Sequence, residues 1–144
     1  MKYELIIDEK EEESIVIRAH SRSEMIIQIE NIINGTKNNK LLGYCDGEIV
    51  PLSLSDVYVF YTSNGKVMAS LEDEIYELKE RLYVVESVVD NSFVKINQGC
   101  IININSILKF DASITGCIKV ILKNGFSDYI SRRELKNVKR RLGL

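Results

Sequence analysis

The chain has few of the residues from which catalytic and metal sites are built. Its 144 residues include no tryptophan, one proline, one histidine (His20) and three cysteines. Cys45, Cys100 and Cys117 are widely spaced and form no C-x-x-C pair, so with a single histidine they cannot supply four zinc ligands by spacing. They fit small, buried or half-buried thiols in a reducing compartment. We expect no metal and no cofactor.

A glycine-rich phosphate loop and a long apolar run are also missing. The glycines never fall into G-x-G-x-x-G or G-x-x-x-x-G-K-[ST]. The acidic runs at 11–13 and 72–74 lie in expected turns, where solvated carboxylates are ordinary, so we expect neither an enzyme nor a small-molecule substrate. No run approaches the ~20 apolar residues that cross a bilayer, and acids follow the apolar residues 5–7 too soon for a signal peptide. The prediction is a cytoplasmic protein.

What the chain does have is a strong separation of charge along its length. Residues 93–144 hold ten Lys or Arg against three acids, a net charge of +7, whereas residues 1–92 hold nine basic and eighteen acidic residues, a net charge of −9. The whole-chain net charge of −2 hides this asymmetry. A basic half of this kind is typical of proteins that bind polyanions. Nucleic acid is therefore the expected partner.

Length and composition favour one domain, residues 41–144, preceded by an extension, residues 1–40. An apolar content of 45% excludes wholesale disorder. The extension is expected to contain a strand at 2–7, an extended segment at 14–19 and a helix at 22–33. The helix would begin at the capping box Ser21-Arg22-Ser23-Glu24 and stop at Asn34-Gly35. Its apolar residues could pack on the domain or pair with a second copy; they are Met25, Ile26, Ile29, Ile32 and Ile33.

Residues 41–144 are expected to form a mainly β domain of the α+β class. Three turn dipeptides, Asp46-Gly47, Asn64-Gly65 and Asn124-Gly125, each separate short β-branched or aromatic runs, which is the strongest short-range signal for a hairpin. The paired strands are predicted at 42–45 with 48–52, 57–61 with 66–70, and 117–122 with 127–130. Further strands are predicted at 74–78, 93–96 and 107–110, and a helix at 80–89.

The most clearly predicted helix ends the chain. Ser131-Arg132-Arg133-Glu134 is a second capping box, and Leu135, Val138 and Leu142 follow at the spacing of a face that packs on a core. Arg132 and Arg133 fall at the first helical positions, where free amides and the helix dipole attract phosphate. Arginines there oppose the dipole, which favours a role in binding over one in stability.

The segment FVKINQGCIIN at 93–103, followed by Ile107, resembles the hallmark of LytTR-type DNA-binding domains. In that family a strand Phe-x-Arg/Lys-Ile/Cys leads into a polar loop, a short apolar turn and Val-Asn. The sequences LKNG at 122–125 and YISRR at 129–133 match the family's C-terminal hairpin and helix. DVYVF at 56–60 and the later Tyr76 to Leu82 fall in the expected order, so the resemblance covers about residues 41–143.

The resemblance implies antiparallel β-sheets with a C-terminal basic helix, and DNA reading by three loops rather than by a recognition helix. The base-contact candidates are Lys66 in the loop at 63–66, Asn97 and Gln98 in the loop after Phe-x-Lys-Ile, and Arg132 and Arg133 at the Ser-Arg-Arg corner. Asn and Gln can pair with adenine, and Arg with guanine. Phosphate contacts, which position without specifying, are expected from Lys95, Lys109, Lys136, Lys139 and Arg140.

One loop departs from the family pattern. The commonest version has His or Ser, then Arg or Lys, then Ser, whereas this chain has Asn97-Gln98-Gly99. The loop has lost a positive charge and a hydroxyl, and Gly99 is expected to add flexibility.

The resemblance also implies a mode of action. Residues 1–40 are too few for the receiver domain that many members carry, so it implies a stand-alone regulator that binds double-stranded DNA at promoter repeats as a homodimer. Compact relatives often act with a small membrane protein. The alternative hypothesis is an interaction module of the same fold that regulates through a partner protein and binds DNA weakly or not at all.

Overall fold

The computed structural model describes residues 10, 15–21, 23–35 and 40–144. The chain divides into two compact units, Met1–Lys37 and Asn38–Leu144. In the first unit, α1 (Glu24–Gly35) is the predicted helix and it ends at the predicted stop. The strand predicted at 2–7 lies outside the described residues, and residues 15–19 belong to no strand. Within the described ranges, no helix is long and apolar enough to cross a membrane.

The first residue of α1 differs from the prediction. The Ser23 side chain accepts a hydrogen bond from the Ile26 amide at 3.4 Å, and the helix begins at Glu24. Ser23, rather than Ser21, is therefore the N-cap. This start places the Glu24 carboxylate in the first turn, where the helix dipole favours a negative charge.

The second unit contains ten strands, two α-helices and two short 3-10 turns in residues 40–144. Seven strands form sheet A in the order β2-β1-β5-β4-β3-β7-β6, and three form sheet B in the order β10-β9-β8. Every strand pairing is antiparallel, so the predicted α+β class with mainly antiparallel β-structure is confirmed. The strands are β1 (Leu41–Cys45), β2 (Glu48–Leu52), β3 (Val59–Ser63), β4 (Lys66–Ser70), β5 (Ile75–Leu78), β6 (Phe93–Asn97), β7 (Cys100–Asn103), β8 (Ile107–Asp111), β9 (Lys119–Leu122) and β10 (Ser127–Tyr129). The helices are α2 (Leu82–Val88) and α3 (Arg132–Leu142).

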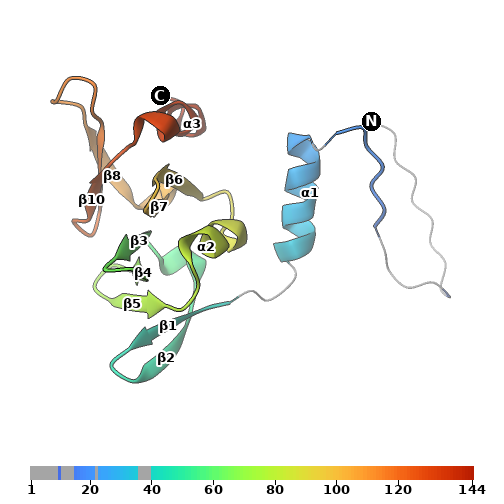
Figure 1. Ribbon diagram of the computed structural model, residues 1–144, viewed down its shortest axis with the longest axis horizontal. Helices are drawn as coiled ribbons and strands as arrows, with labels where there is room; N and C mark the ends of the chain where they lie inside the picture. Colours follow the sequence, from blue (N-terminus) through green and yellow to red (C-terminus); the bar gives the residue numbers. More distant parts are fainter. Residues whose placement is uncertain (1–9, 11–14, 22, 36–39) are drawn as a thin grey trace. The chain divides into compact units, whose positions relative to one another are not determined.

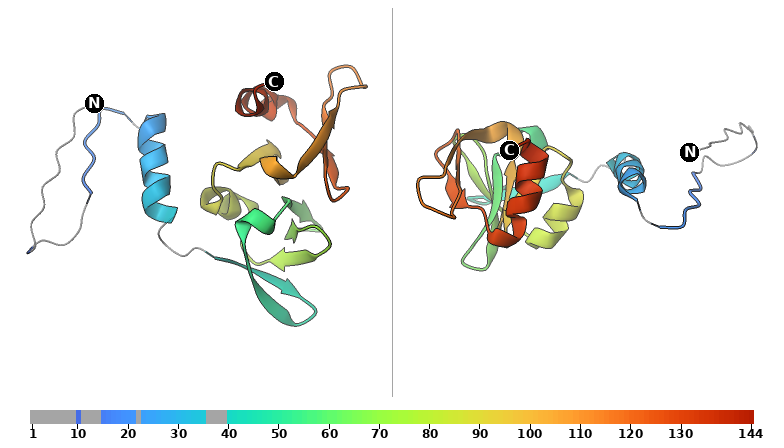
Figure 2. Two further views of the ribbon diagram at one scale, coloured as in Figure 1. Left: turned by 180° about the vertical axis from the view of Figure 1, so that it is seen from behind. Right: turned by 90° about the horizontal axis from the view of Figure 1, so that it is seen from above.

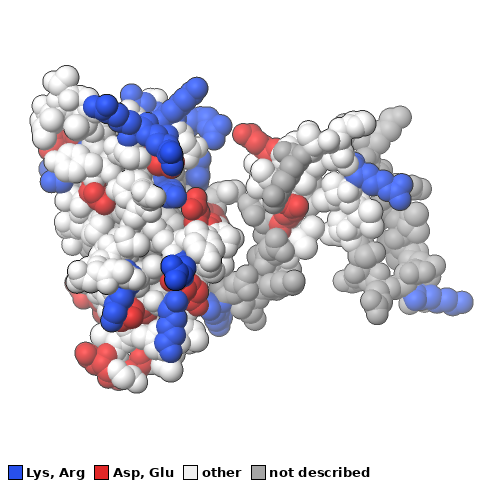
Figure 3. All heavy atoms as spheres, in the orientation of Figure 1, with Lys and Arg blue, Asp and Glu red and all other residues white. Residues whose placement is uncertain are grey.

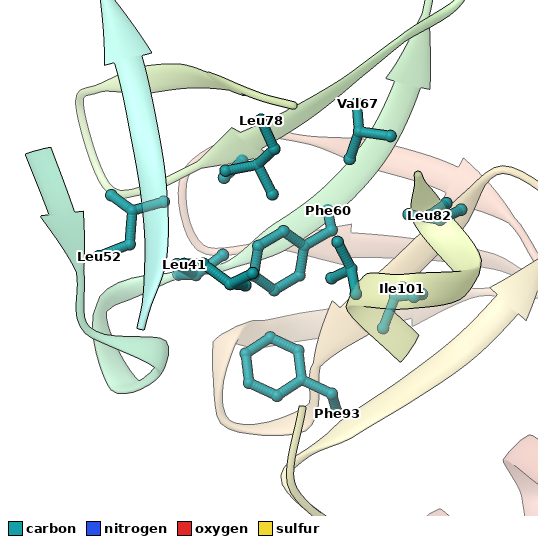
Figure 4. Close-up of a cluster of buried hydrophobic side chains, with 11 residues drawn as sticks. Leu41, Leu52, Phe60, Val67, Leu78, Leu82, Phe93 and Ile101 are labelled. Atoms are coloured by element: carbon teal, nitrogen blue, oxygen red, sulfur yellow. The ribbon is translucent and has the colours of Figure 1, made fainter. Parts of the chain in front are cut away.

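Sheet A is buried on both faces in its β3-β7-β6 half. Because neighbouring strand residues point to opposite faces, adjacent residues belong to different clusters. Phe60, Phe93 and Ile101 join one cluster with Leu82 and Val85 of α2 (Figure 4). The second cluster lies between sheet A, sheet B and α3; it includes Val59, Val94, Ile102, Val120, Leu122 and Val138. The domain therefore has three layers, with α2 on one side of sheet A and with sheet B and α3 on the other.

Two of the three predicted hairpin turns have the expected geometry. Asp46 and Gly47 have φ of 49° and 80°, and Asn64 and Gly65 have φ of 51° and 75°. Positive φ at both central residues is what a two-residue type I′ turn requires. These turns join β1 to β2 and β3 to β4, as predicted.

The third hairpin forms with a longer turn than the dipeptide Asn124-Gly125 predicts. Only Gly125 has a positive φ, 89°, and its amide donates to the Leu122 carbonyl at 3.0 Å. The cause is tertiary: the Asn124 side chain donates to the Leu71 carbonyl of the neighbouring sheet segment at 2.8 Å and accepts from the Phe126 amide at 3.1 Å. These bonds hold Asn124 in a conformation other than the left-handed one.

The predicted strands at 74–78, 93–96 and 107–110 are present as β5, β6 and β8, and the helix at 80–89 is α2. Strand β7 was not predicted, because the family pattern describes that run as a short apolar turn. All four residues of β7 are buried, and it pairs with β3 and β6.

Helix α3 begins as predicted, with the Ser131 side chain accepting from the Glu134 amide at 3.3 Å. In a complete capping box the Glu134 side chain would accept a hydrogen bond from the Ser131 amide. Here the Ser131 amide donates instead to the Ile96 carbonyl at 2.8 Å. Figures 1 and 2 show β1 and β2 at one end of the domain and α3 with β8–β10 at the other.

Candidate nucleic-acid interface

The three loops of the sequence prediction form one continuous surface. The Thr62 amide donates to the Gly99 carbonyl at 2.9 Å, which joins the β3–β4 hairpin to the β6–β7 turn. The Asn97 side chain donates to the Tyr129 carbonyl at 2.9 Å, which joins the β6–β7 turn to the end of β10. The bond from Ser131 to Ile96 adds a second link to the same corner. We call this the three-loop surface; it comprises residues 62–66, 97–99 and 129–133.

Gln98, Arg132 and Arg133 are base-contact candidates with exposed side chains. Gln98 is exposed at the tip of the β6–β7 turn, and both arginines are exposed at the first two positions of α3. The guanidinium groups form no hydrogen bond or ion pair with the described residues. These three side chains are therefore available to a ligand.

Lys66 also lies on the three-loop surface, at the first position of β4. Its Nζ is 3.3 Å from Glu77 Oε2, and the Lys66 side chain is 60% exposed. An ion pair this exposed contributes little to stability. The pairing therefore leaves Lys66 able to exchange the carboxylate for another acceptor.

Asn97 differs from its neighbour Gln98 because both N–H groups of its side-chain amide are already donated to the protein. Nδ2 donates to Asp128 Oδ2 at 3.0 Å and to the Tyr129 carbonyl at 2.9 Å, and Oδ1 accepts from the Gly99 amide at 2.9 Å. A primary amide has only two N–H donors. In this conformation Asn97 has no donor left for a base.

Gly99 is closely packed against Thr62, and both its backbone amide and its carbonyl are hydrogen-bonded. A Cβ at this position would lie 2.6 Å from Thr62 Oγ1. The Gly99 carbonyl accepts from the Thr62 amide, and its own amide donates to Asn97. The glycine therefore lets the β6–β7 turn sit directly against β3.

The phosphate-contact candidates fall into two groups. Lys and Arg gather over the end of the domain where α3 lies (Figure 3). Lys136 and Lys139 are exposed on α3 and Lys109 is exposed on β8, whereas Arg140 donates to Asn137 Oδ1 at 3.0 Å. Lys95 is placed differently: it is half-buried, and its Nζ is 3.6 Å from Glu86 Oε2 of α2.

Residues 47–143 match the family model of the LytTr DNA-binding domain. The chain belongs to the LytTR family. Its relatives include two proteins of Staphylococcus aureus, each described as an "uncharacterized HTH-type transcriptional regulator". The one from strain MSSA476 is 36% identical over 146 residues, spanning 100% of this chain and 99% of the relative. The one from strain NCTC 8325 is 35% identical over the same spans.

A solved LytTr DNA-binding domain from Bacillus cereus has the same fold as the second unit of this chain. The superposition has a TM-score of 0.69 and covers 74% of this chain and 100% of the solved domain, with 17% sequence identity. At this identity the likeness is one of fold.

The pKa values of Cys100 and Asp111 are shifted in opposite directions by their surroundings. Burial, and secondly the Asp128 carboxylate, raise the pKa of the Cys100 thiol well above its ordinary value, so the thiol stays protonated. Hydrogen bonds from Ser113 hold the pKa of Asp111 below its usual range. Among the described residues, no group of three or more His, Cys, Asp or Glu is placed to hold a metal ion.

Two features of the interface were not predicted from sequence. Arg141, one of the basic residues of α3, donates to the carbonyls of Asn91 and Phe93 at 2.6 and 2.9 Å, so it anchors the helix to β6. The second is Asp128, whose Oδ2 accepts a hydrogen bond from the Asn97 side-chain amide. The sequence Asn97-Gln98-Gly99 did carry one signal, because Asn often accepts from the amide two residues later. The partner Asp128 lies 31 residues away and had no signal.

Proposed function

We propose that this chain is a sequence-specific DNA-binding transcriptional regulator, whose LytTR domain reads the major groove with the three-loop surface. The observation that carries the proposal is the hydrogen-bonded junction of the three loops beside the basic helix α3. It presents an exposed amide and two exposed guanidinium groups on one surface. These are the side chains whose hydrogen-bonding patterns match adenine and guanine in the major groove.

In this proposal the base contacts come from Lys66, Gln98, Arg132 and Arg133. Arg133 is the candidate for bidentate pairing with guanine O6 and N7, with Arg132 beside it, and Gln98 is the candidate for adenine. Lys66 would exchange its exposed partner Glu77 for a base or phosphate acceptor. The α3 amino terminus supports an anionic ligand at the same corner, since its first amides and dipole favour negative charge.

The phosphate anchors are proposed to be Lys109, Lys136, Lys139 and Arg140. Such contacts fix the orientation of the protein on the duplex without reading sequence. Lys95 fits this role least well, because its ammonium faces α2 and pairs with Glu86.

Loop reading is also favoured by the order of the elements. Strands β6 to β10 separate α2 from α3, so residues 40–144 contain no two α-helices that follow one another directly. A helix-turn-helix motif needs two such helices joined by a short turn. The three-loop surface is the alternative that the described domain offers.

The proposal is tested by fluorescence anisotropy with DNA from upstream of the protein's own gene and with a scrambled duplex of equal length. We expect tighter binding to the upstream duplex, and a loss of about 1–3 kcal/mol with relaxed base preference for Arg133→Ala. Lys95→Ala is the matched control and should bind like the wild type. Equal binding to both duplexes would contradict specific reading. No binding at low salt would favour the partner-protein hypothesis.

We propose further that two copies act together on repeated sites, with α1 as the contact. Met25 and Ile32 lie one heptad apart on α1, where they are 50% and 72% exposed, and such an apolar stripe is typical of a helix that packs on another. Sedimentation equilibrium should show a dimer that Ile32→Glu converts to a monomer; an unchanged mass would contradict the role of α1. A small membrane protein remains a proposed partner on the family resemblance alone.

A further inference from the structure

We propose that Asn97 is a positioning residue, whose side-chain amide holds the Gln98 turn in register with the corner that carries Arg132 and Arg133. The inference rests on the proposed function and deepens it, because it assigns a role within the same DNA-reading surface. It also removes Asn97 from the side chains that touch a base.

The hydrogen bonds of Asn97 argue against direct base pairing. Both N–H groups are donated, to Asp128 Oδ2 and to the Tyr129 carbonyl, and Oδ1 accepts from the Gly99 amide. Pairing with adenine needs a free donor and a free acceptor on the same amide. Asn97 would have to break one of its two donated bonds at a half-buried site to supply the donor, whereas the exposed Gln98 breaks none.

The hydrogen bonds of the Asn97 side chain join the end of one sheet to the end of the other. Asn97 is the last residue of β6 in sheet A, and Asp128 and Tyr129 are the last two residues of β10 in sheet B. After β10 ends at Tyr129, the chain continues through Ile130 to the N-cap Ser131. The Asn97 side chain therefore links the turn that carries Gln98 to the strand that leads into Arg132 and Arg133. The backbone hydrogen bond from the Ser131 amide to the Ile96 carbonyl also joins these two segments.

The consequence for DNA reading is a coupling between the two contacts. Base-reading groups must be held within a fraction of an ångström of their productive positions. If the Asn97 side chain is removed, Gln98 and Arg133 keep their chemistry but lose their fixed separation. Affinity should fall while the preferred base at each position stays the same.

Asn124, in the turn between β9 and β10, offers a matched control. Its Nδ2 donates to Ser70 Oγ at 3.1 Å and to the Leu71 carbonyl at 2.8 Å, and its Oδ1 accepts from the Phe126 amide at 3.1 Å. The bonding pattern is the same as that of Asn97, with two donated bonds to another segment and one accepted from the amide two residues later. Asn124 lies outside the three-loop surface, so its removal should cost stability without costing DNA affinity.

The test compares Asn97→Ala with Asn124→Ala in the full-length chain. For Asn97→Ala we expect about tenfold weaker binding to the upstream duplex, with unchanged base ranking in a panel of single base-pair substitutions. Gln98→Ala should then weaken DNA binding less in the Asn97→Ala background than in the wild type. Asn124→Ala should lower the melting temperature about as much as Asn97→Ala does, but it should leave the affinity for DNA unchanged. Loss of preference at a single base pair would overturn the proposal, and so would equal weakening by Asn124→Ala.

Two further variants keep the side-chain volume. Asn97→Asp retains the acceptor for Gly99 but places a carboxylate against Asp128, so it should bind DNA at least as weakly as Asn97→Ala. Adding Asp128→Asn restores a donor between the two side chains and should recover part of the affinity. No recovery in the double variant would contradict the link through Asp128.

A measurement without DNA separates this inference from the proposed function. In nitrogen-15 correlation spectra, Asn97→Ala should shift the amides of both Gln98 and Arg133, whereas Asn124→Ala should shift neither. If the wild type failed to bind DNA, the proposed function would fall, and these spectra would still decide whether Asn97 links the two loops. Unchanged Arg133 signals in Asn97→Ala would overturn the inference.

Discussion

The salt dependence of DNA binding should report which lysines touch phosphate. Each neutralised phosphate contributes about −0.9 to the slope of log K against log salt. Four anchors, Lys109, Lys136, Lys139 and Arg140, give a slope of about −3.6 for each bound protomer. Between 50 and 200 mM salt the affinity should therefore fall by roughly 150-fold. The double variant Lys136→Ala/Lys139→Ala removes two contacts, so its slope should be about −1.8 and its affinity should fall by only roughly 12-fold over the same range.

The matched control is Lys95→Ala. Lys95 carries the same charge, but its ammonium lies 3.6 Å from Glu86 on the α2 side of β6, so its loss should leave the slope unchanged. Fluorescence anisotropy at four salt concentrations, with one duplex and all three proteins, gives the slopes directly. The reasoning is refuted if Lys95→Ala makes the slope shallower by about 0.9, the value for one lost phosphate contact, or if the double variant keeps the wild-type slope.

Two predictions concern the framework that supports the surface. Ser131→Ala removes the side-chain acceptor of the Glu134 amide and should lower the free energy of unfolding by about 1 kcal/mol, measured by urea titration; Ser127→Ala, at an exposed strand residue, is the control, and equal stability of the two variants would contradict the cap. Burial raises the pKa of Cys100, so at alkaline pH the unfolded chain ionises its thiol before the folded chain does. The free energy of unfolding should therefore fall as pH rises above the ordinary thiol pKa of about 8.5, by up to about 1.4 kcal/mol per pH unit from this group. Cys100→Ala should show a shallower decline in the same titration, and parallel curves for the two proteins would refute the assignment.

Local signals predicted the parts of the fold that local chemistry decides. Asp46-Gly47 and Asn64-Gly65 form the turns that their sequences favour, because both residues of each pair tolerate positive φ. Ser131 caps α3 at the predicted start of the helix. In each case the residues that set the geometry are neighbours in the chain.

Where distant partners decide the geometry, the sequence was not enough. Asn124-Gly125 has the composition of a two-residue turn, yet the bond from Asn124 to Leu71 imposes a longer one. Asn97 has the chemistry of an adenine reader, yet Asp128 and the Tyr129 carbonyl occupy its donors. Lys95 has a phosphate anchor's charge, yet its strand position turns it toward Glu86. Each difference comes from a contact that only the packing of sheet A, sheet B and α2 brings together.

The most direct test of the account is a titration of nitrogen-15-labelled protein with the upstream duplex, followed by amide chemical shifts. The account predicts the largest changes at the three-loop surface, in residues 62–66, 97–99 and 129–133, with smaller changes along α3. The amide chemical shifts of β1, β2 and α2 should not change. Shifts concentrated on β1 and β2, with the three loops unchanged, would contradict the claim that these loops read DNA.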